Sequence, residues 1–461
     1  MKKMISLITV MLLLVGLGVP ALAEDAPIKV TKVYEVAQGE LLGSTNLVAF
    51  RAKSFDPTGI MGPDGTVLVP DEYLWLDSKN PWGYIEAAKL DQLNGKGVID
   101  QTGKVLVPFE YGELEILSKD WIVGIRLKES TKEHYDYQAL FGGYGSGYYL
   151  IEDRTFYNMK TGEAVGSLTR DQVDTVRVYD GFLQIEDLNG AVTAYDENLQ
   201  PLGPVDKIYY GYDIAQNGDQ WEVKRVADGQ VVLTSPHQIN SYKIEDGNFD
   251  ITKDGKRGLM DIQGNVLVPA EYDNLYKADG DYVRAKLDRE GKMGVLDLQG
   301  NVVVDFKYDD VIVTYARGES DGQRTFVFVK GYAPVELGGK VGFVNDKGEE
   351  TVAPTYLKDA VEVTANSLLI TAADGKFTLV AADGTVTELP YAKAERIYNG
   401  MDGRLYVVTD EAGQVGVVDW HGNLVIPMGP YSGYGNYTST SGDLLLMDNR
   451  DTRKVEVYRV E

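Results

Sequence analysis

Histidine and aspartate side chains are the groups in this chain whose chemistry suits catalysis or metal binding. The histidines are His134, His237 and His421, and none lies within a few residues of another. Acid–base or metal chemistry would require them to meet in space, so we expect them at the surface. The sequence has no nucleophile elbow, phosphate-binding glycine loop, HExxH motif or thiol pair. We therefore predict no catalytic residue, no cofactor and no metal site.

Four aspartates each stand three residues before a glycine, and they could form a row of carboxylates for Ca²⁺. A calcium site needs six or more oxygen atoms from several groups, and the sequence contains no D-x-D-x-D-G loop. An aspartate at this position can instead accept hydrogen bonds from the backbone amides of its own turn. We interpret these residues as turn caps. They are Asp100, Asp261, Asp297 and Asp419.

Tyrosines interleaved with glycine and serine form the segments best suited to ligand binding. Tyrosine supplies rigid amphipathic contact area, and its aromatic face can stack on a sugar ring. Binding residues also concentrate in loops on rigid scaffolds. The alternative is that tyrosine is simply frequent here and that part of these segments is strand. The candidate ligand-binding residues are Tyr144, Tyr148, Tyr149, Tyr209, Tyr210, Tyr212, Tyr431, Tyr434 and Tyr437.

The elements that position these residues are copies of one short unit. GKRGLMDIQGNVLVPAEYDNL at 255–275 and GKMGVLDLQGNVVVDFKYDDV at 291–311 share one frame. The same frame recurs at 95–114, 339–360 and 413–431, and weaker copies bring the total to about ten within residues 24–461. Longer steps within 112–250 indicate an inserted loop and degenerate units. The structural turn glycines are Gly65, Gly103, Gly264, Gly300, Gly348 and Gly422.

Each unit predicts a β-meander of three or four short strands. The D-x-x-G connection suits a tight hairpin, because glycine adopts a positive φ without steric cost. Asn198 takes the glycine position in one degenerate copy. One meander buries too little surface to be stable alone, so neighbouring units must stack.

Two all-β architectures satisfy that requirement: a β-propeller, as one large ring or two, and an open superhelical array. The chain ends favour closure. Residues 443–458 resemble two strands that lack a third, and residues 29–36 resemble an outer strand with no unit before it. Joined, they would complete one further blade.

The frame G-K-x-G…D-x-x-G-x-V-x-x-P-x-x-Y-D resembles that of the WG-repeat proteins, a bacterial family with exported members. This resemblance implies an extracytoplasmic binding or interaction role and supplies no catalytic residues. The tryptophan that names the family is replaced here by Arg257, Met293, Val341 and Val415, while the following glycine is kept. A kept glycine beside a varied residue indicates a close approach of backbones at that point.

The first 23 residues predict a secretory signal peptide. Two lysines precede an apolar run from 4 to 19, and Ala-Leu-Ala at 21–23 forms a small-x-small cleavage site. An uncleaved membrane anchor is the alternative, although the run is shorter than the roughly 20 residues of a span. Cleavage removes two lysines and no acids, so the net charge of −25 becomes −27.

The mature protein should therefore be secreted or held in the cell envelope, and it should not span the membrane. Its negative charge opposes binding to nucleic acid, and without cysteine it has no disulfides.

These observations favour an exported, non-catalytic binding scaffold. Its partner would be a cell-surface glycan, a cell-wall component or a protein. One alternative is a propeller-type carbohydrate-active enzyme, which would need carboxylates about 5 to 10 Å apart at a common mouth. Another is a structural spacer at the cell surface, which burial of the tyrosine segments between units would favour.

Overall fold

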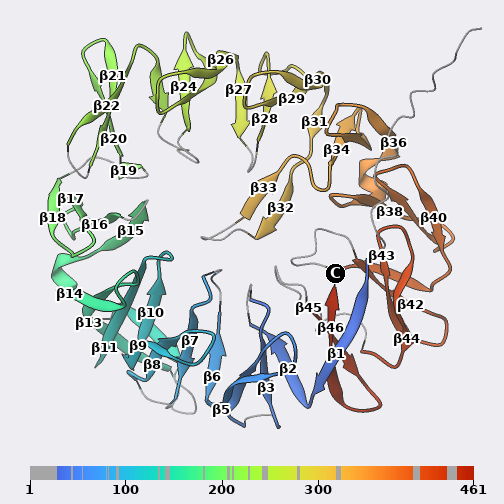
Figure 1. Ribbon diagram of the computed structural model, residues 1–461, viewed down its shortest axis with the longest axis horizontal. Coiled ribbons are helices and arrows are strands. Elements are labelled where there is room, and N and C mark those ends of the chain that lie inside the picture. The colour runs from blue at the N-terminus through green and yellow to red at the C-terminus, as the bar shows by residue number, and fades with distance from the viewer. Residues whose placement is uncertain are drawn as a thin grey trace, which may run out of the picture.

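The repeat unit folds as an antiparallel meander in which the first strand lies innermost and the fourth lies outermost (Figure 1). The computed structural model describes residues 28–42, 45–53, 56–78, 80, 82–89, 93–132, 135–140, 146–179, 182–204, 208–209, 212–226, 229–240, 248–277, 281–317, 323–397, 405–432 and 444–460. Across these residues, eleven antiparallel sheets stand side by side in one ring, together with a small inserted hairpin. This confirms the predicted all-β propeller and selects a single large ring over two rings or an open array.

Ten blades follow one another along the chain. Blade 1 consists of β2 (Gln38–Leu41), β3 (Val48–Arg51), β4 (Thr58–Met61) and β5 (Val67–Tyr73). Blade 2 consists of β6 (Trp75–Asp77), β7 (Ile85–Ala88), β8 (Lys96–Ile99) and β9 (Val105–Tyr111). Blade 3 is β10 (Glu113–Ile116), β11 (Trp121–Ser130), β12 (Tyr137–Leu140), β13 (Ser146–Asn158) and β14 (Glu163–Thr169). Blade 4 consists of β15 (Thr175–Tyr179), β16 (Phe182–Glu186), β17 (Val192–Tyr195) and β18 (Pro201–Pro204). Blade 5 consists of β19 (Ile208–Tyr209), β20 (Tyr212–Asn217), β21 (Gln220–Arg225) and β22 (Val231–Ser235).

Blades 6 and 7 contain the clearest copies of the repeat. Blade 6 consists of β23 (Gln238–Asn240), β24 (Asn248–Lys253), β25 (Lys256–Asp261) and β26 (Val266–Tyr272). Blade 7 consists of β27 (Asn274–Lys277), β28 (Tyr282–Lys286), β29 (Met293–Asp297) and β30 (Val302–Tyr308). Blade 8 is β31 (Asp310–Val311), β34 (Tyr332–Leu337), β35 (Lys340–Asn345) and β36 (Glu350–Leu357). Its inserted hairpin, β32 (Thr314–Arg317) and β33 (Gln323–Phe326), projects toward the middle of the ring (Figure 1).

Blades 9 and 10 lead to the end of the chain. Blade 9 consists of β37 (Val361–Val363), β38 (Ser367–Thr371), β39 (Phe377–Ala381) and β40 (Val386–Leu389). Blade 10 consists of β41 (Lys393–Arg396), β42 (Leu405–Thr409), β43 (Val415–Asp419) and β44 (Leu424–Gly429). Two 3₁₀ turns, Arg170–Gln172 and Lys358–Ala360, are the helical segments of the described chain, and none of its helices is long and apolar enough to cross a bilayer.

The closing blade joins the two ends of the chain. It consists of β45 (Leu444–Asn449), β46 (Lys454–Val460) and the N-terminal strand β1 (Val30–Val36), in the order β1-β46-β45. Strand β1 pairs antiparallel with β46 from Val30 opposite Val460 to Val36 opposite Val455. The blade expected from joining residues 29–36 to 443–458 is therefore present, and β1 supplies its outer strand (Figure 1).

The turn glycines serve both the hairpin and the packing between blades. All six predicted turn glycines have φ between +80° and +88°. A Cβ built on Gly348 of blade 8 would lie closer than 3.0 Å to the carbonyl oxygen of Val303, in the outer strand of blade 7. The same step recurs at Gly65, whose Cβ would meet Tyr34 of β1. Each of these turns thus packs against the outer strand of the preceding blade, and for blade 1 that outer strand is β1.

One degenerate turn differs from the expectation. The residue with positive φ is Leu199, at +58°, rather than Asn198. The side chain of Asp196 accepts the amide hydrogens of Asn198 and Gln200, which fixes the bend one residue later than the alignment placed it.

The second kept glycine of the repeat marks a β-bulge between the third and fourth strands. In blade 7, Met293 pairs with Tyr308 and Val295 pairs with Val304, so the register shifts at Gly294. A Cβ on Gly294 would lie 2.7 Å from the carbonyl oxygen of Val304 and 2.9 Å from the ring of Phe306. The close backbone approach inferred from the sequence is thus present at this position.

The hydrophobic core lies between neighbouring blades. In the outer strands β9, β26 and β30, burial follows one pattern, in which the third residue and the final tyrosine are buried. Val268 and Tyr272 of blade 6 pack in one cluster with Val283 and Leu296 of blade 7. Because each apolar face is covered by the next blade, the array is stable only as a stack.

Candidate binding site

The tyrosine segments lie on separate blades. Tyr148 and Tyr149 are half-buried in β13 of blade 3, and the ring of Tyr148 lies 4.9 Å from that of Tyr135 between centroids. Tyr209 and Tyr212 pair with each other across β19 and β20 of blade 5, and Tyr212 packs against the core there. The structure does not bring these described tyrosines together. Tyr144, Tyr210, Tyr434 and Tyr437 lie outside the described residues.

Tyr431 is buried where blade 10 meets the closing blade, with 8% of its surface exposed. In blade 10, Val415 pairs with Gly429, as Met293 pairs with Tyr308 in blade 7. Glycine therefore takes the strand position of the repeat tyrosine, and the ring of Tyr431 lies within 2.6 Å of where a Gly429 Cβ would stand. Tyr431 fills the volume that the repeat tyrosine fills in other blades.

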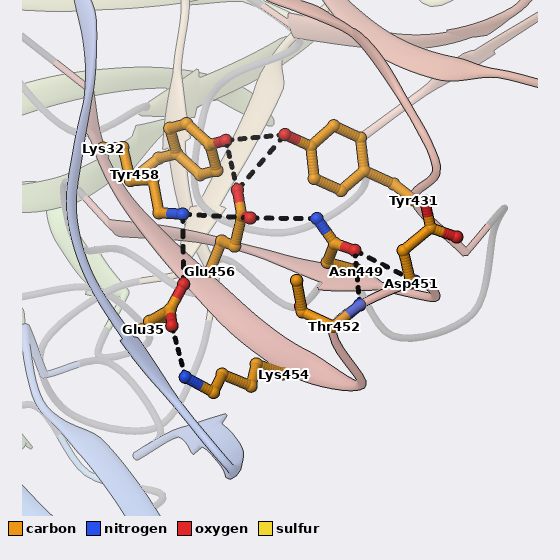
Figure 2. Close-up of polar contacts among 9 residues, drawn as sticks. All are labelled: Lys32, Glu35, Tyr431, Asn449, Asp451, Thr452, Lys454, Glu456 and Tyr458. Atoms are coloured by element: carbon orange, nitrogen blue, oxygen red, sulfur yellow. Dashed lines mark hydrogen bonds and ion pairs between the residues drawn. The ribbon is translucent and has the colours of Figure 1, made fainter.

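A cluster of polar side chains surrounds Tyr431 at this seam (Figure 2). We call it the seam cluster. The hydroxyls of Tyr431 and Tyr458 are 2.8 Å apart, and both donate to Oε2 of Glu456, at 3.2 and 2.7 Å. Nδ2 of Asn449 donates to Oε1 of Glu456 at 3.0 Å, and Nζ of Lys32 lies 2.9 Å from the same oxygen. Lys32 comes from β1, so this contact joins the N-terminal strand to the C-terminal strand.

The electrostatics of the seam cluster favour a charged Glu456. Burial alone would raise the pKa of this carboxyl, but hydrogen bonds from Tyr458, Lys32 and Asn449 outweigh burial and lower it. Burial raises the pKa of the Tyr431 and Tyr458 phenols, which therefore stay neutral and act as donors. Glu35 of β1 forms a second cross-strand ion pair, at 2.5 Å from Nζ of Lys454. These bonds hold Glu456 as a charged acceptor between the strands of the closing blade.

A pocket of about 570 Å³ adjoins the seam cluster, and we call it the seam pocket. It lies between the start of β2 and the hairpin that connects β45 to β46, where the chain passes from the closing blade into blade 1. Its charged and amide side chains are Gln38, Glu40, Asp448, Asn449, Arg450, Arg453 and Lys454.

The aspartates before the turns are committed to those turns. Oδ1 of Asp297 accepts the amides of Gln299 and Asn301 at 2.9 and 2.8 Å, and Oδ2 accepts Nδ2 of Asn301. Burial opposes ionisation of Asp297, yet these hydrogen bonds lower its pKa. Asp100, Asp261 and Asp419 bond in the same way. In the part of the chain that the structure describes, no three His, Asp or Glu side chains are grouped so as to hold a metal ion.

The two histidines that the structure describes, His237 and His421, lie on different blades and do not meet. His421 is half-buried, and its Nε2 lies 3.1 Å from Oδ2 of Asp383 in blade 9, while its ring lies against Trp420. His237 is half-buried at the end of blade 5, and His134 lies outside the described residues.

A family model of the WG-containing repeat matches residues 97–123, 258–290 and 293–314. The chain contains WG repeats. The matched segments cover the third strand of blades 2, 6 and 7 and the strands that follow, which are the copies where the repeat is clearest.

Two of the matched repeats use their tyrosine hydroxyl between blades. In the WG repeat of blade 2, the Tyr111 hydroxyl lies 2.7 Å from that of Tyr157 in blade 3. In blade 7, the Tyr308 hydroxyl donates to Glu350 of blade 8 at 2.8 Å. Tyr431 repeats this bond across the seam.

No curated protein matches the sequence of this WG-repeat chain. Solved structures that align with it include a eukaryotic initiation factor, with 10% identity, a TM-score of 0.36 and coverage of 84% of this chain and 94% of that chain. BamB from Moraxella catarrhalis aligns with 15% identity and a TM-score of 0.23, over 64% of this chain and 98% of that one. The C-terminal WD40 domain of Sif2 aligns with 9% identity and a TM-score of 0.25, over 94% and 99%. At these values the alignments bear on neither ligand nor partner.

The seam pocket was not predicted from the sequence. Its two walls are about 410 residues apart in the chain, and the repeat pattern does not record which side chains converge. The available signal was the charged hairpin NRDTRK at 449–454, which interrupts two apolar strands at the predicted closing blade.

Proposed function

We propose that this WG-repeat protein is an exported binding protein without catalytic activity, and that its partner is a cell-surface glycan, a cell-wall component or a surface protein. The observation that best supports the proposal is the seam pocket, a polar recess built on a closed ring. Its volume falls within the roughly 300 to 1,000 Å³ typical of small-ligand sites. The export part of the proposal rests on residues 1–23 of the sequence.

The rigidity of the pocket supports binding. Asn449, at the base of the hairpin, accepts the amides of Asp451 and Thr452 with Oδ1 and donates to Glu456 with Nδ2. The backbone of the hairpin is therefore held by the seam cluster before any ligand binds. Pre-organisation of this kind reduces the entropic cost of association.

The positions of the carboxylates support binding over catalysis. The turn aspartates accept backbone amides, and Glu456 is saturated by tyrosine, lysine and asparagine donors. A glycoside-cleaving site would need one carboxyl with a raised pKa about 5 to 10 Å from a second, ionised carboxylate. Within the seam pocket, Glu40 is held by Arg51 at 3.2 Å.

A binding survey on the mature chain, residues 24–461, tests the proposal. The protein would be applied to arrays of glycans and cell-wall fragments and, separately, to intact bacterial cells, with an unrelated protein of similar negative charge as control. The expected result is retention on at least one glycan, wall fraction or cell surface above that control. Retention nowhere would contradict the proposal. Release of reducing sugar from a retained glycan would instead establish the enzymatic alternative.

A further inference from the structure

The charges of the seam pocket differ from those of the whole protein. The chain has a net charge of −25, yet three arginine or lysine side chains face two carboxylates in the pocket lining. A local excess of positive charge on an acidic protein favours anionic ligands at that point. The pairings within the pocket show which cations are available.

Two of the pocket charges are compensated by neighbours on the strands. Lys454 is paired with Glu35 at 2.5 Å, and Glu40 is paired with Arg51 at 3.2 Å. The pocket lining also contains the guanidinium groups of Arg450 and Arg453, and a carboxylate, Asp448, that has an interaction partner of its own.

The two arginines are presented differently. Arg450 is anchored on blade 10, since its Nη2 donates to the carbonyl oxygen of Gly413 at 2.9 Å and its Nε donates to that of Pro430 at 3.3 Å. These bonds fix the guanidinium plane and involve no carboxylate, so its charge is not neutralised by them. Arg453 stands at the turn with φ of +56°, and its amide donates to the carbonyl oxygen of Asn449 at 2.8 Å. Its side chain is exposed.

We propose that the seam pocket binds a saccharide unit bearing a carboxylate or a phosphate group, with Arg453 and Arg450 as the anion contacts. Arginine suits this role because its planar fork matches both anions in a bidentate geometry. The lining described by the structure contains no aromatic ring, so recognition relies on charge and hydrogen bonds and not on stacking. Gln38 and Ser432 add polar groups for sugar hydroxyls. This inference rests on the proposed binding function.

Titration calorimetry on the mature chain tests the inference with three probes. Digalacturonic acid presents carboxylates, glucose 6-phosphate presents a phosphate, and cellobiose is neutral. We expect at least one anionic probe to bind at least tenfold more tightly than cellobiose and to weaken as salt is raised from about 50 to 500 mM. The anionic probe that binds identifies the source of the anion. Equal binding of all three, or binding of none, would overturn the inference.

Two variants locate the binding. Arg453→Asn removes the charge and keeps a residue that tolerates a positive φ, and Arg450→Gln removes the second charge. Each should weaken the anionic probe about tenfold or more and leave the circular dichroism spectrum unchanged. Arg289→Asn, an exposed turn arginine of blade 7, is the matched control and should bind as the wild type does. Unchanged affinity in both pocket variants would refute the site.

The outcome is separable from that of the proposed function. Retention on cell surfaces without binding of either anionic probe would refute the pocket inference and leave the binding function in place. Binding of a probe without retention on any surface, glycan or wall fraction would contradict the proposed cell-surface partner and leave the pocket inference in place.

Discussion

Replacing Gly348 with alanine tests the packing between blades. Gly348 and Gly375 both have φ of +81°, but they differ in their surroundings. A Cβ on Gly348 would overlap the carbonyl oxygen of Val303 in the preceding blade, whereas a Cβ on Gly375 would meet nothing within 4 Å. Gly375→Ala is therefore a control with the same backbone strain and no collision.

The expected magnitudes follow from these geometries. An alanine in the left-handed region costs about 1 kcal/mol relative to glycine, and this cost applies to both variants. At Gly348 the outer strand of blade 7 must also move away, and such overpacking costs a further 1 to 3 kcal/mol or so. We expect a loss of about 1 kcal/mol for Gly375→Ala and roughly 2 to 4 kcal/mol for Gly348→Ala.

Urea denaturation followed by far-ultraviolet circular dichroism measures the two losses side by side. The slope of the free energy against urea should be unchanged in both variants, because the exposed surface on unfolding is the same. Equal losses for the two glycines would refute the reasoning, since they would show that turn strain alone explains the repeat glycine and that blade 8 does not lean on blade 7.

Two further predictions concern titratable groups. Glu456→Gln should cost about 2 kcal/mol, because a neutral amide then replaces the buried carboxylate that accepts hydrogen bonds from Tyr458 and Lys32. Since the pKa of Glu456 is lowered, its contribution is present above about pH 4.3, the ordinary glutamate value, and is lost as the pH falls through the lower folded value. The stability difference between the two proteins should therefore shrink below about pH 4. Burial raises the pKa of Tyr406 to about 12. Stability from the neutral phenol is complete below about pH 10 and is lost between pH 10 and 12. Tyr406→Phe should lose less stability than wild type over that range in thermal melts, and equal losses would contradict the assignment.

The strands and bends could be predicted because the repeat encodes them locally. A glycine such as Gly300 has one role in its own hairpin, and the tyrosine eight residues later marks the end of the outer strand, so the pattern fixes both. Strand β1 was predictable for a related reason. Its apolar alternation resembles an outer strand, and residues 443–458 resemble two strands that lack a third.

The choice of a single ring could not be predicted from the same pattern. Ring curvature depends on how one blade contacts the next, and contacts such as Gly348 with Val303 join residues that are far apart in the chain. The repeat specifies that these surfaces meet, but not the angle at which they meet. One ring of eleven blades and two smaller rings are both compatible with the repeat pattern.

The candidate site was predicted less well, for two physical reasons. The seam pocket combines side chains from opposite ends of the chain, such as Gln38 and Arg453, and no local spacing relates them. Tyr431 was grouped with the tyrosine-rich segments by composition. Tyr431 lies nine residues after Gly422, whereas the repeat tyrosine lies eight residues after its turn glycine. This spacing is the signal that Tyr431 substitutes for the repeat tyrosine, because the outer strand of blade 10 ends at Gly429.

Closure of the ring depends on the pairing of β1 with β46, and a disulfide tests that pairing most directly. Thr31 lies opposite Arg459 in the register, and paired residues on neighbouring strands are close enough for a disulfide. The natural chain has no cysteine, so Thr31→Cys with Arg459→Cys introduces the only two thiols. Mild oxidation of the folded monomer should link them within one chain and make it migrate faster on a non-reducing denaturing gel. The pair Thr31→Cys with Lys128→Cys should stay open. A monomer that stays unlinked in the first variant, or links equally in both, would contradict the closed ring.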